Sequence, residues 1–132
     1  MELVKRYLIT LVVFFVIDIF WLGVVAKKLY SKELGFIMSD RPNWTAAIIF
    51  YLVFIMGLVF FVINPAMEKD AWQYALFVGM FFGFVTYATY DLTNLATLKN
   101  WPLKITLIDL AWGTSLGGAV STLSFFILKW LK

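Results

Sequence analysis

Four long apolar stretches dominate the sequence, and each is long enough to cross a lipid bilayer as a helix. They cover residues 7–26, 46–63, 71–98 and 103–128. The hydrocarbon core of a bilayer is about 30 Å thick, which takes about 20 helical residues to cross. Backbone polar groups find no water in that core, so helices are predicted rather than open strands. We therefore expect an all-α integral membrane protein: an antiparallel four-transmembrane-helix bundle that forms a single membrane domain.

The composition excludes a soluble domain of this size. Of the 132 residues, 63% are hydrophobic and only 14% are charged. A chain this short buries too little surface to hide so many apolar side chains from water. The absence of cysteine and histidine excludes cofactors that these residues would ligate, such as zinc–thiolate, iron–sulfur and His-ligated haem sites. No cofactor is identifiable, although carboxylates leave an oxygen-ligated cation possible.

The basic residues lie mostly between the apolar stretches and form no block that would bind nucleic acid. We therefore expect membrane lipid as the main partner and no nucleic acid. An even number of spans places both termini on the same side of the membrane. The basic residues divide five against six between the two sides, so the excess of positive charge that marks the cytoplasmic side leaves the orientation open.

Three aspartates lie inside the apolar stretches: Asp18, Asp91 and Asp109. A carboxylate at the centre of a membrane helix costs about 2.5–3.5 kcal/mol on insertion scales, so these positions demand an explanation. Each lies six to eight residues from the end of its stretch, and these three ends face the same side of the membrane. At 1.5 Å rise per residue, the three carboxylates are expected to share one layer, roughly 9–12 Å below that surface.

Two repeats with four-residue spacing predict which helices pack most closely. They are Gly79, Gly83, Tyr87 and Asp91 in the third stretch, and Asp109, Gly113, Gly117 and Ser121 in the fourth. Small residues at this spacing allow membrane helices to approach each other closely. The third and fourth helices are therefore expected to form a tight hairpin. Because Asp91 and Asp109 are each nine residues from Asn100 in the connecting turn, they should lie opposite each other.

Polar and aromatic residues near the aspartate layer complete a predicted ligand-binding pocket. These candidates are Tyr51, Tyr87, Asn94, Trp21 and Trp112. Tyr51 has a similar depth in the second helix, Tyr87 is one turn from Asp91, and each tryptophan follows an aspartate by three residues. If the pocket holds a metal ion, its ligands are expected to be the three aspartates.

The same layer leads to an expectation about protonation. The interiors of the stretches contain no lysine or arginine, and Lys104 lies at the very start of the fourth. Carboxylates close together in a low dielectric cannot all stay ionised cheaply. Without a bound cation, at least one of the three is expected to be protonated at neutral pH. The affinity for a cation or amine should then rise with pH, since binding would displace a proton.

Three functions remain open on these residues. The pocket is predicted to bind or transport a proton, a cation, or an amine-bearing small molecule or lipid. Four helices make a thin pathway, so a homo-oligomer is expected. The alternative is a lipid-modifying membrane enzyme or a subunit of one, although no nucleophile or known motif identifies a reaction. The third is a structural or assembly factor, in which the aspartates only fix helix packing by accepting hydrogen bonds.

Several short motifs resemble those of a known family. They are DIFWLG at 18–23, RPNW at 41–44, YDLTNLA at 90–96 and DLAWG at 109–113. In these motifs, and over essentially the whole chain, the sequence resembles the DUF2177 family of small bacterial membrane proteins of unknown function. The resemblance implies four spans and a place in the bacterial cytoplasmic membrane. It implies no particular activity.

Overall fold

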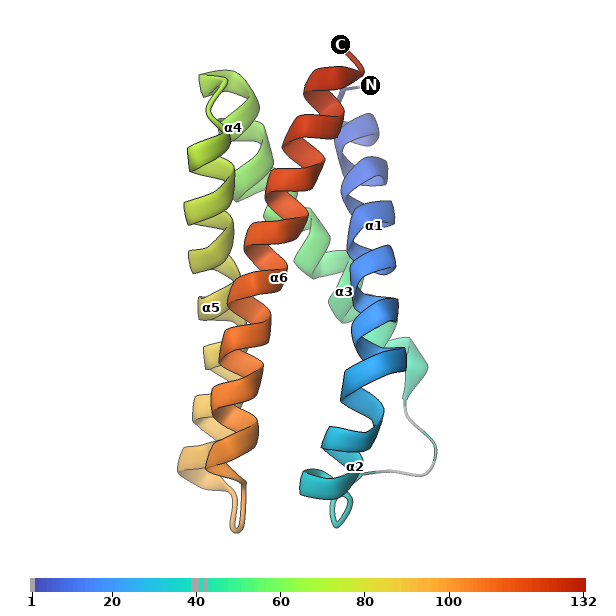
Figure 1. The fold of residues 1–132 in the computed structure, drawn as a ribbon, viewed down its shortest axis with the longest axis vertical. Helices are drawn as coiled ribbons and strands as arrows, with labels where there is room; N and C mark the ends of the chain where they lie inside the picture. Colours follow the sequence, from blue (N-terminus) through green and yellow to red (C-terminus); the bar gives the residue numbers. More distant parts are fainter. Residues whose placement is uncertain (1, 39–40, 42) are drawn as a thin grey trace.

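The computed structural model describes residues 2–38, 41 and 43–132. Within them, four continuous helical rods are long and apolar enough to cross a membrane: Glu2–Leu34, Trp44–Lys69, Trp72–Thr97 and Leu103–Trp130. The rods run alternately up and down, and the two chain ends lie at the same end of the bundle (Figure 1). The predicted all-α membrane fold is confirmed. Asp40 and Pro42, which belong to the predicted connection between the first and second spans, lie outside the described residues.

The first rod is longer than the predicted helix at 7–26, and it contains a wider turn. It consists of α1 (Glu2–Trp21), the π-helical segment η1 (Leu22–Ala26) and α2 (Lys27–Leu34). Lys27 and Lys28 end the apolar stretch in the sequence, which predicts a connection after position 26. The structure instead continues the helix for two more turns. Short π-helical insertions of this kind are frequent at functional sites.

The second rod also contains a π-helical segment, and it passes through a proline. It consists of α3 (Trp44–Leu58), η2 (Val59–Ile63) and α4 (Asn64–Lys69). The predicted helix end at residue 63, before Pro65, is therefore wrong. Proline breaks an α-helix because it lacks an N–H and its ring meets the preceding turn. Here the Asn64 N–H already bonds five residues back, to the Val59 carbonyl, and such local widening accommodates proline within membrane helices.

The third and fourth rods, α5 (Trp72–Thr97) and α6 (Leu103–Trp130), lie side by side along their length (Figure 1). Their turn contains Asn100 in the left-handed conformation, at φ 64°, which asparagine tolerates better than most residues. A Cβ atom built on Gly83 would lie 2.9 Å from the Gly113 carbonyl carbon and 3.2 Å from the Gly117 Cα. The two backbones therefore touch along the predicted glycine seam.

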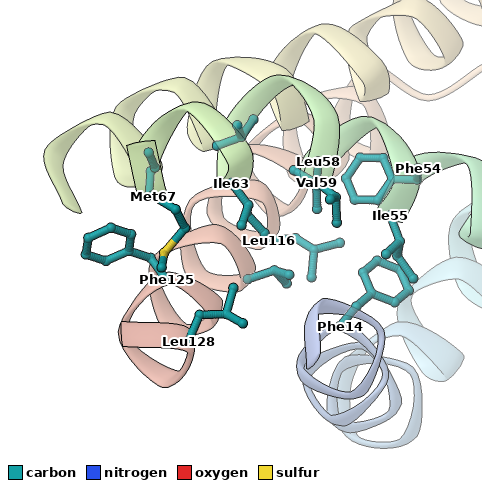
Figure 2. Close-up of a cluster of buried hydrophobic side chains, with 14 residues drawn as sticks. Phe14, Phe54, Ile55, Leu58, Val59, Ile63, Met67, Leu116, Phe125 and Leu128 are labelled. Carbon is teal, nitrogen blue, oxygen red and sulfur yellow. The ribbon is translucent and has the colours of Figure 1, made fainter. Parts of the chain in front are cut away.

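From the middle of the bundle to the end that holds the chain termini, the interior is mostly apolar, with Thr10, Ser121 and Ser124 also buried. Phe14 of α1, Ile55 and Leu58 of α3, and Leu116 of α6 are fully buried and point toward one another (Figure 2). The outer surface is also apolar, with Phe20, Phe60 and Phe81 all mostly exposed. Such a surface is suited to lipid rather than to water.

The arrangement of α3 determines the shape of the other end. This helix begins beside α1 and crosses the bundle diagonally, so that its continuation through η2 and α4 reaches α5 (Figure 1). Near the middle of the bundle, the Phe54 and Phe82 rings of α3 and α5 are 5.5 Å apart between centroids. Beyond that contact, toward the turn between α5 and α6, α3 and α5 diverge.

Candidate functional site

The space left by this divergence is a cavity of about 840 Å³. Its wall comes from all four rods and includes two of the aspartates, Asp18 and Asp109. Most of the remaining wall is aromatic or aliphatic. The lining residues include no lysine or arginine among those that the structure describes. The volume is in the usual range for small-molecule pockets, about 300–1,000 Å³.

Asp91 and Asp109 form a buried carboxyl pair behind one wall of the cavity. Asp91 of α5 is 0% exposed and Asp109 of α6 is 6% exposed, and their carboxyl groups lie against each other. Neither oxygen of Asp91 receives a hydrogen bond from a protein donor. The Tyr30 hydroxyl of α2 donates to Asp109 Oδ1. Asp109 therefore links the buried Asp91 to the cavity surface.

Asp18 of α1 also lines the cavity and has a partner of its own. It is 5% exposed, and the Tyr51 hydroxyl donates to its carboxylate. The Tyr51 ring packs on Phe14 and Phe15, with centroids 5.4 and 5.9 Å away. These contacts fix the direction of the hydroxyl, since the ring cannot turn without displacing the core below it.

Tyr87 of α5 lines the cavity as well. Its ring packs on Gly113 of the neighbouring helix, where an added Cβ would collide with it. Its hydroxyl lies near enough to Asp18, Asp91 and Asp109 to interact electrostatically with all three carboxylates. The glycine at position 113 therefore has a second role besides close packing: it makes room for an aromatic ring at the centre of the site.

Two tryptophans close the side of the cavity between α1 and α6. The Trp21 and Trp112 rings stack with centroids 4.2 Å apart and planes 9° from parallel. At the end near the turn, Lys104 Nζ lies 3.6 Å from Glu33 Oε1, and Leu34 packs with Trp101 and Ile105. The α1–α6 side and this end are therefore both occupied by side-chain contacts.

The cavity wall contains most of the residues that were predicted for a pocket, but not all of them. Those on the wall are Asp18, Trp21, Tyr51, Tyr87, Asp109 and Trp112. Asp91 is not on the wall, because the close approach of α5 and α6 covers it. Asn94 is not on it either, and its side chain hydrogen bonds to Tyr90 instead. Within the described residues, no three acidic side chains lie close enough together to hold a metal ion.

A comparison with protein families places these motifs in context. The family model described as predicted membrane protein, DUF2177, matches residues 3–126. The chain belongs to the DUF2177 family. The match covers the helices that contribute the carboxyl groups, and its description agrees with the membrane fold. No curated protein and no solved structure matches the chain.

Tyr30 is the site residue that sequence reasoning missed in this DUF2177 protein, because it was assigned to a connection after the first span. On a regular α-helix, positions 18 and 30 would differ in direction by roughly 120°. The segment η1 inserts one residue into the helical turn, which reduces the difference to roughly 20°. The same inserted residue also turns Ala26 toward the inner face, where it is 1% exposed.

The carboxyl pair leads to a spectroscopic prediction. Two buried carboxyl groups in contact are expected to share one proton at neutral pH, because both burial and the like charge oppose double ionisation. Infrared difference spectra between about pH 5 and pH 9 should show a protonated carboxyl band that persists at pH 7 and disappears in Asp91→Asn. Asp70→Asn, at the other end of the bundle, is the control. A wild-type spectrum without the band would contradict the shared proton.

Proposed function

We propose that this membrane protein binds an amine-bearing ligand, whose ammonium group lies in the cavity between Asp109 and Asp18. The observation that carries the proposal is a wall with two carboxyl groups, an adjoining unpartnered carboxyl group, and no basic side chain among the described lining residues. A buried negative charge requires a compensating positive charge or a proton. An ammonium group would supply both charge and hydrogen-bond donors to carboxylates that have few of them.

The rest of the wall favours an organic ammonium over a bare cation. A metal ion prefers six or more oxygen ligands, whereas Trp21, Trp112, Tyr30 and Tyr87 present ring surfaces. Aromatic faces attract organic cations at short range, and the aliphatic part of a ligand would pack on the same rings. These are the features by which proteins distinguish an amine from an inorganic ion of equal charge.

The layout of the bundle favours the binding of a ligand over the conduction of ions through the membrane. The cavity occupies only one end, and the apolar core around Phe14, Ile55 and Leu116 fills the other. A continuous polar path between the two ends would have to displace that core. We therefore infer a receptor-like or carrier role for a ligand held at one level of the membrane.

The binding experiment compares three probes of equal length: hexylammonium, hexanol and hexanoate. We expect isothermal titration calorimetry on the purified protein in lipid nanodiscs to detect hexylammonium only. Asp109→Asn should weaken it by at least about tenfold, because a charged hydrogen bond is worth about 1.5–3 kcal/mol. The matched control is Asp70→Asn, whose carboxylate pairs with Lys129 at the opposite end. Equal binding of hexanol would contradict the proposal.

A second candidate function is a lipid-modifying membrane enzyme, or a subunit of one, in which the carboxyl pair serves as a general acid. The specific observation in its favour is the contact between Asp91 and Asp109, since a shared proton could be donated to a substrate. Mass spectrometry of the nanodisc lipids before and after incubation distinguishes the two. A new lipid product that disappears in Asp109→Asn would favour the enzyme.

A further inference from the structure

Side-chain contacts close two sides of the cavity and part of a third. The glycine seam closes the side between α5 and α6. The Trp21–Trp112 stack and the Tyr30–Asp109 hydrogen bond close the side between α1–α2 and α6. The Tyr51 contacts with Phe14, Phe15 and Asp18 close the side between α1 and α3 at their own level. Farther along the first rod, Leu22 lines the cavity and is 43% exposed. The fourth side lies between α3 and α5.

The side between α3 and α5 is closed only at the level of Phe54 and beyond it toward the chain termini. There, Phe82 packs on Phe54 and Phe61, with ring centroids 5.5 and 6.2 Å away. At the level of the carboxyl groups, Phe50 of α3 and Val85 of α5 line the cavity, yet they are 42% and 44% exposed. Side chains that face both a cavity and the outer surface mark an opening. We call this opening, between Ala47 and Phe50 on α3 and Val85 and Thr89 on α5, the lateral gap.

The chemistry of the lateral gap suits hydrocarbon rather than water. Its edges are alanine, phenylalanine and valine, together with two threonines whose hydroxyls bond to their own helix. Thr86 Oγ1 donates to the Phe82 carbonyl, at 2.8 Å, and Thr89 Oγ1 donates to the Val85 carbonyl, at 2.7 Å. Their hydrogen-bonding capacity is largely used inside α5. The gap opens within the length of both helices, where the surrounding medium is the bilayer.

We propose that the ligand is a membrane amphiphile, whose ammonium head lies at Asp109 and whose hydrocarbon chain passes through the lateral gap into the bilayer. This inference rests on the proposed function and adds the class of ligand and its route of entry. It is supported by the continuity of a charged inner end with an apolar outer opening. A soluble amine would need neither the opening nor its apolar edges.

A single substitution tests the passage of the chain through the lateral gap separately from the binding of the ammonium group. Ala47→Phe narrows the lateral gap from the α3 side. Ala46→Phe is its matched control, since Ala46 is exposed and does not line the cavity. The probes are hexylammonium, which fits inside the cavity, and octadecylammonium, whose extended chain is longer than one leaflet, or half of the roughly 30 Å core. Affinities are measured in nanodiscs and referred to the mole fraction of amine in the lipid.

With affinities referred to the mole fraction of amine in the lipid, the wild-type affinities for the two amines should agree within about threefold. The reason is that a chain in the gap and a chain in lipid have similar surroundings. Ala47→Phe should weaken octadecylammonium at least about tenfold more than it weakens hexylammonium. Ala46→Phe should change neither. If Ala47→Phe fails to fold, Val85→Phe narrows the gap from the α5 side and should show the same selectivity.

Two results would overturn the inference while leaving the proposed function intact. One is that wild type binds hexylammonium and rejects octadecylammonium, which would mean a closed pocket for a soluble amine. The other is that narrowing the gap affects both amines equally or neither. If wild type binds neither amine, the proposed function itself fails, and the inference fails with it.

Discussion

Gly83→Leu is expected to abolish the folded bundle. A leucine side chain at this position would enter the backbone of α6, since even its Cβ would lie 2.9 Å from the Gly113 carbonyl carbon. Overpacking against movable side chains costs about 1–3 kcal/mol, and here the obstacle is backbone, so a loss above about 4 kcal/mol is expected. The measurement is thermal unfolding in detergent, together with the yield of monodisperse protein.

The control for this prediction is the same substitution at a glycine with free space around it. A Cβ built on Gly23 meets nothing within 4 Å. The free energy of unfolding of Gly23→Leu should therefore lie within about 0.5 kcal/mol of the wild-type value. Both variants add the same side chain, and the comparison therefore isolates the effect of position. A Gly83→Leu protein as stable as the control would show that α5 and α6 are not in backbone contact.

Asp91→Asn is expected to stabilise the protein, which is unusual for a substitution at a fully buried polar residue. The two Asp91 oxygens have no protein donor, and the nearest group is another carboxyl group, that of Asp109. The asparagine amide would donate a hydrogen bond to Asp109 without first taking up a proton. The amide keeps the hydrogen bond that the shared proton provides and removes the cost of taking up that proton on folding at neutral pH. That cost is about 1.4 kcal/mol for each pH unit above the range in which a free carboxyl group titrates, so a gain of about 1–3 kcal/mol is expected.

Chemical unfolding of Asp91→Asn beside two other variants tests this expectation. Asp91→Leu should be less stable than Asp91→Asn, because it removes the carboxylate without giving Asp109 a donor. Asp70→Asn breaks an exposed ion pair with Lys129 and should change stability by less than about 1 kcal/mol. A marked loss of stability in Asp91→Asn would mean that the carboxyl group of Asp91 has a cation as its partner.

The features that could be predicted from the sequence are those that depend on composition and regular spacing. The apolar stretches predict the four membrane-crossing helices, since their length exceeds what a soluble protein of this size can bury. The spacing of Gly79, Gly83, Gly113 and Gly117 places all four on one seam, because each helix interior there is regular α-helix. The position of Asp91 opposite Asp109 follows from the same regularity and from their equal distances to Asn100.

What could not be predicted depends on irregular turns. The segments η1 and η2 shift the helical phase by one residue, and no residue type in 22–26 or 59–63 marks such a turn. The inward direction of Tyr30 and the continuation of the helix through Pro65 both depend on these segments. Asn94 is off the cavity wall for a different reason: it lies in the last turn of α5, past the residues of that helix that line the cavity, and its side chain bonds to Tyr90.

The distribution of the polar partners has a consequence for how the chain is made. Asp18 on the first rod has its partner, Tyr51, on the second rod, and Asp91 on the third rod meets Asp109 on the fourth. Spans leave the ribosome in this order. The first and second spans therefore contain both partners of one polar contact, and the third and fourth contain both partners of the other. An isolated aspartate in a membrane helix is costly. If the spans enter the bilayer as two hairpins, each acidic side chain meets its counterpart on insertion, before the second hairpin joins the first.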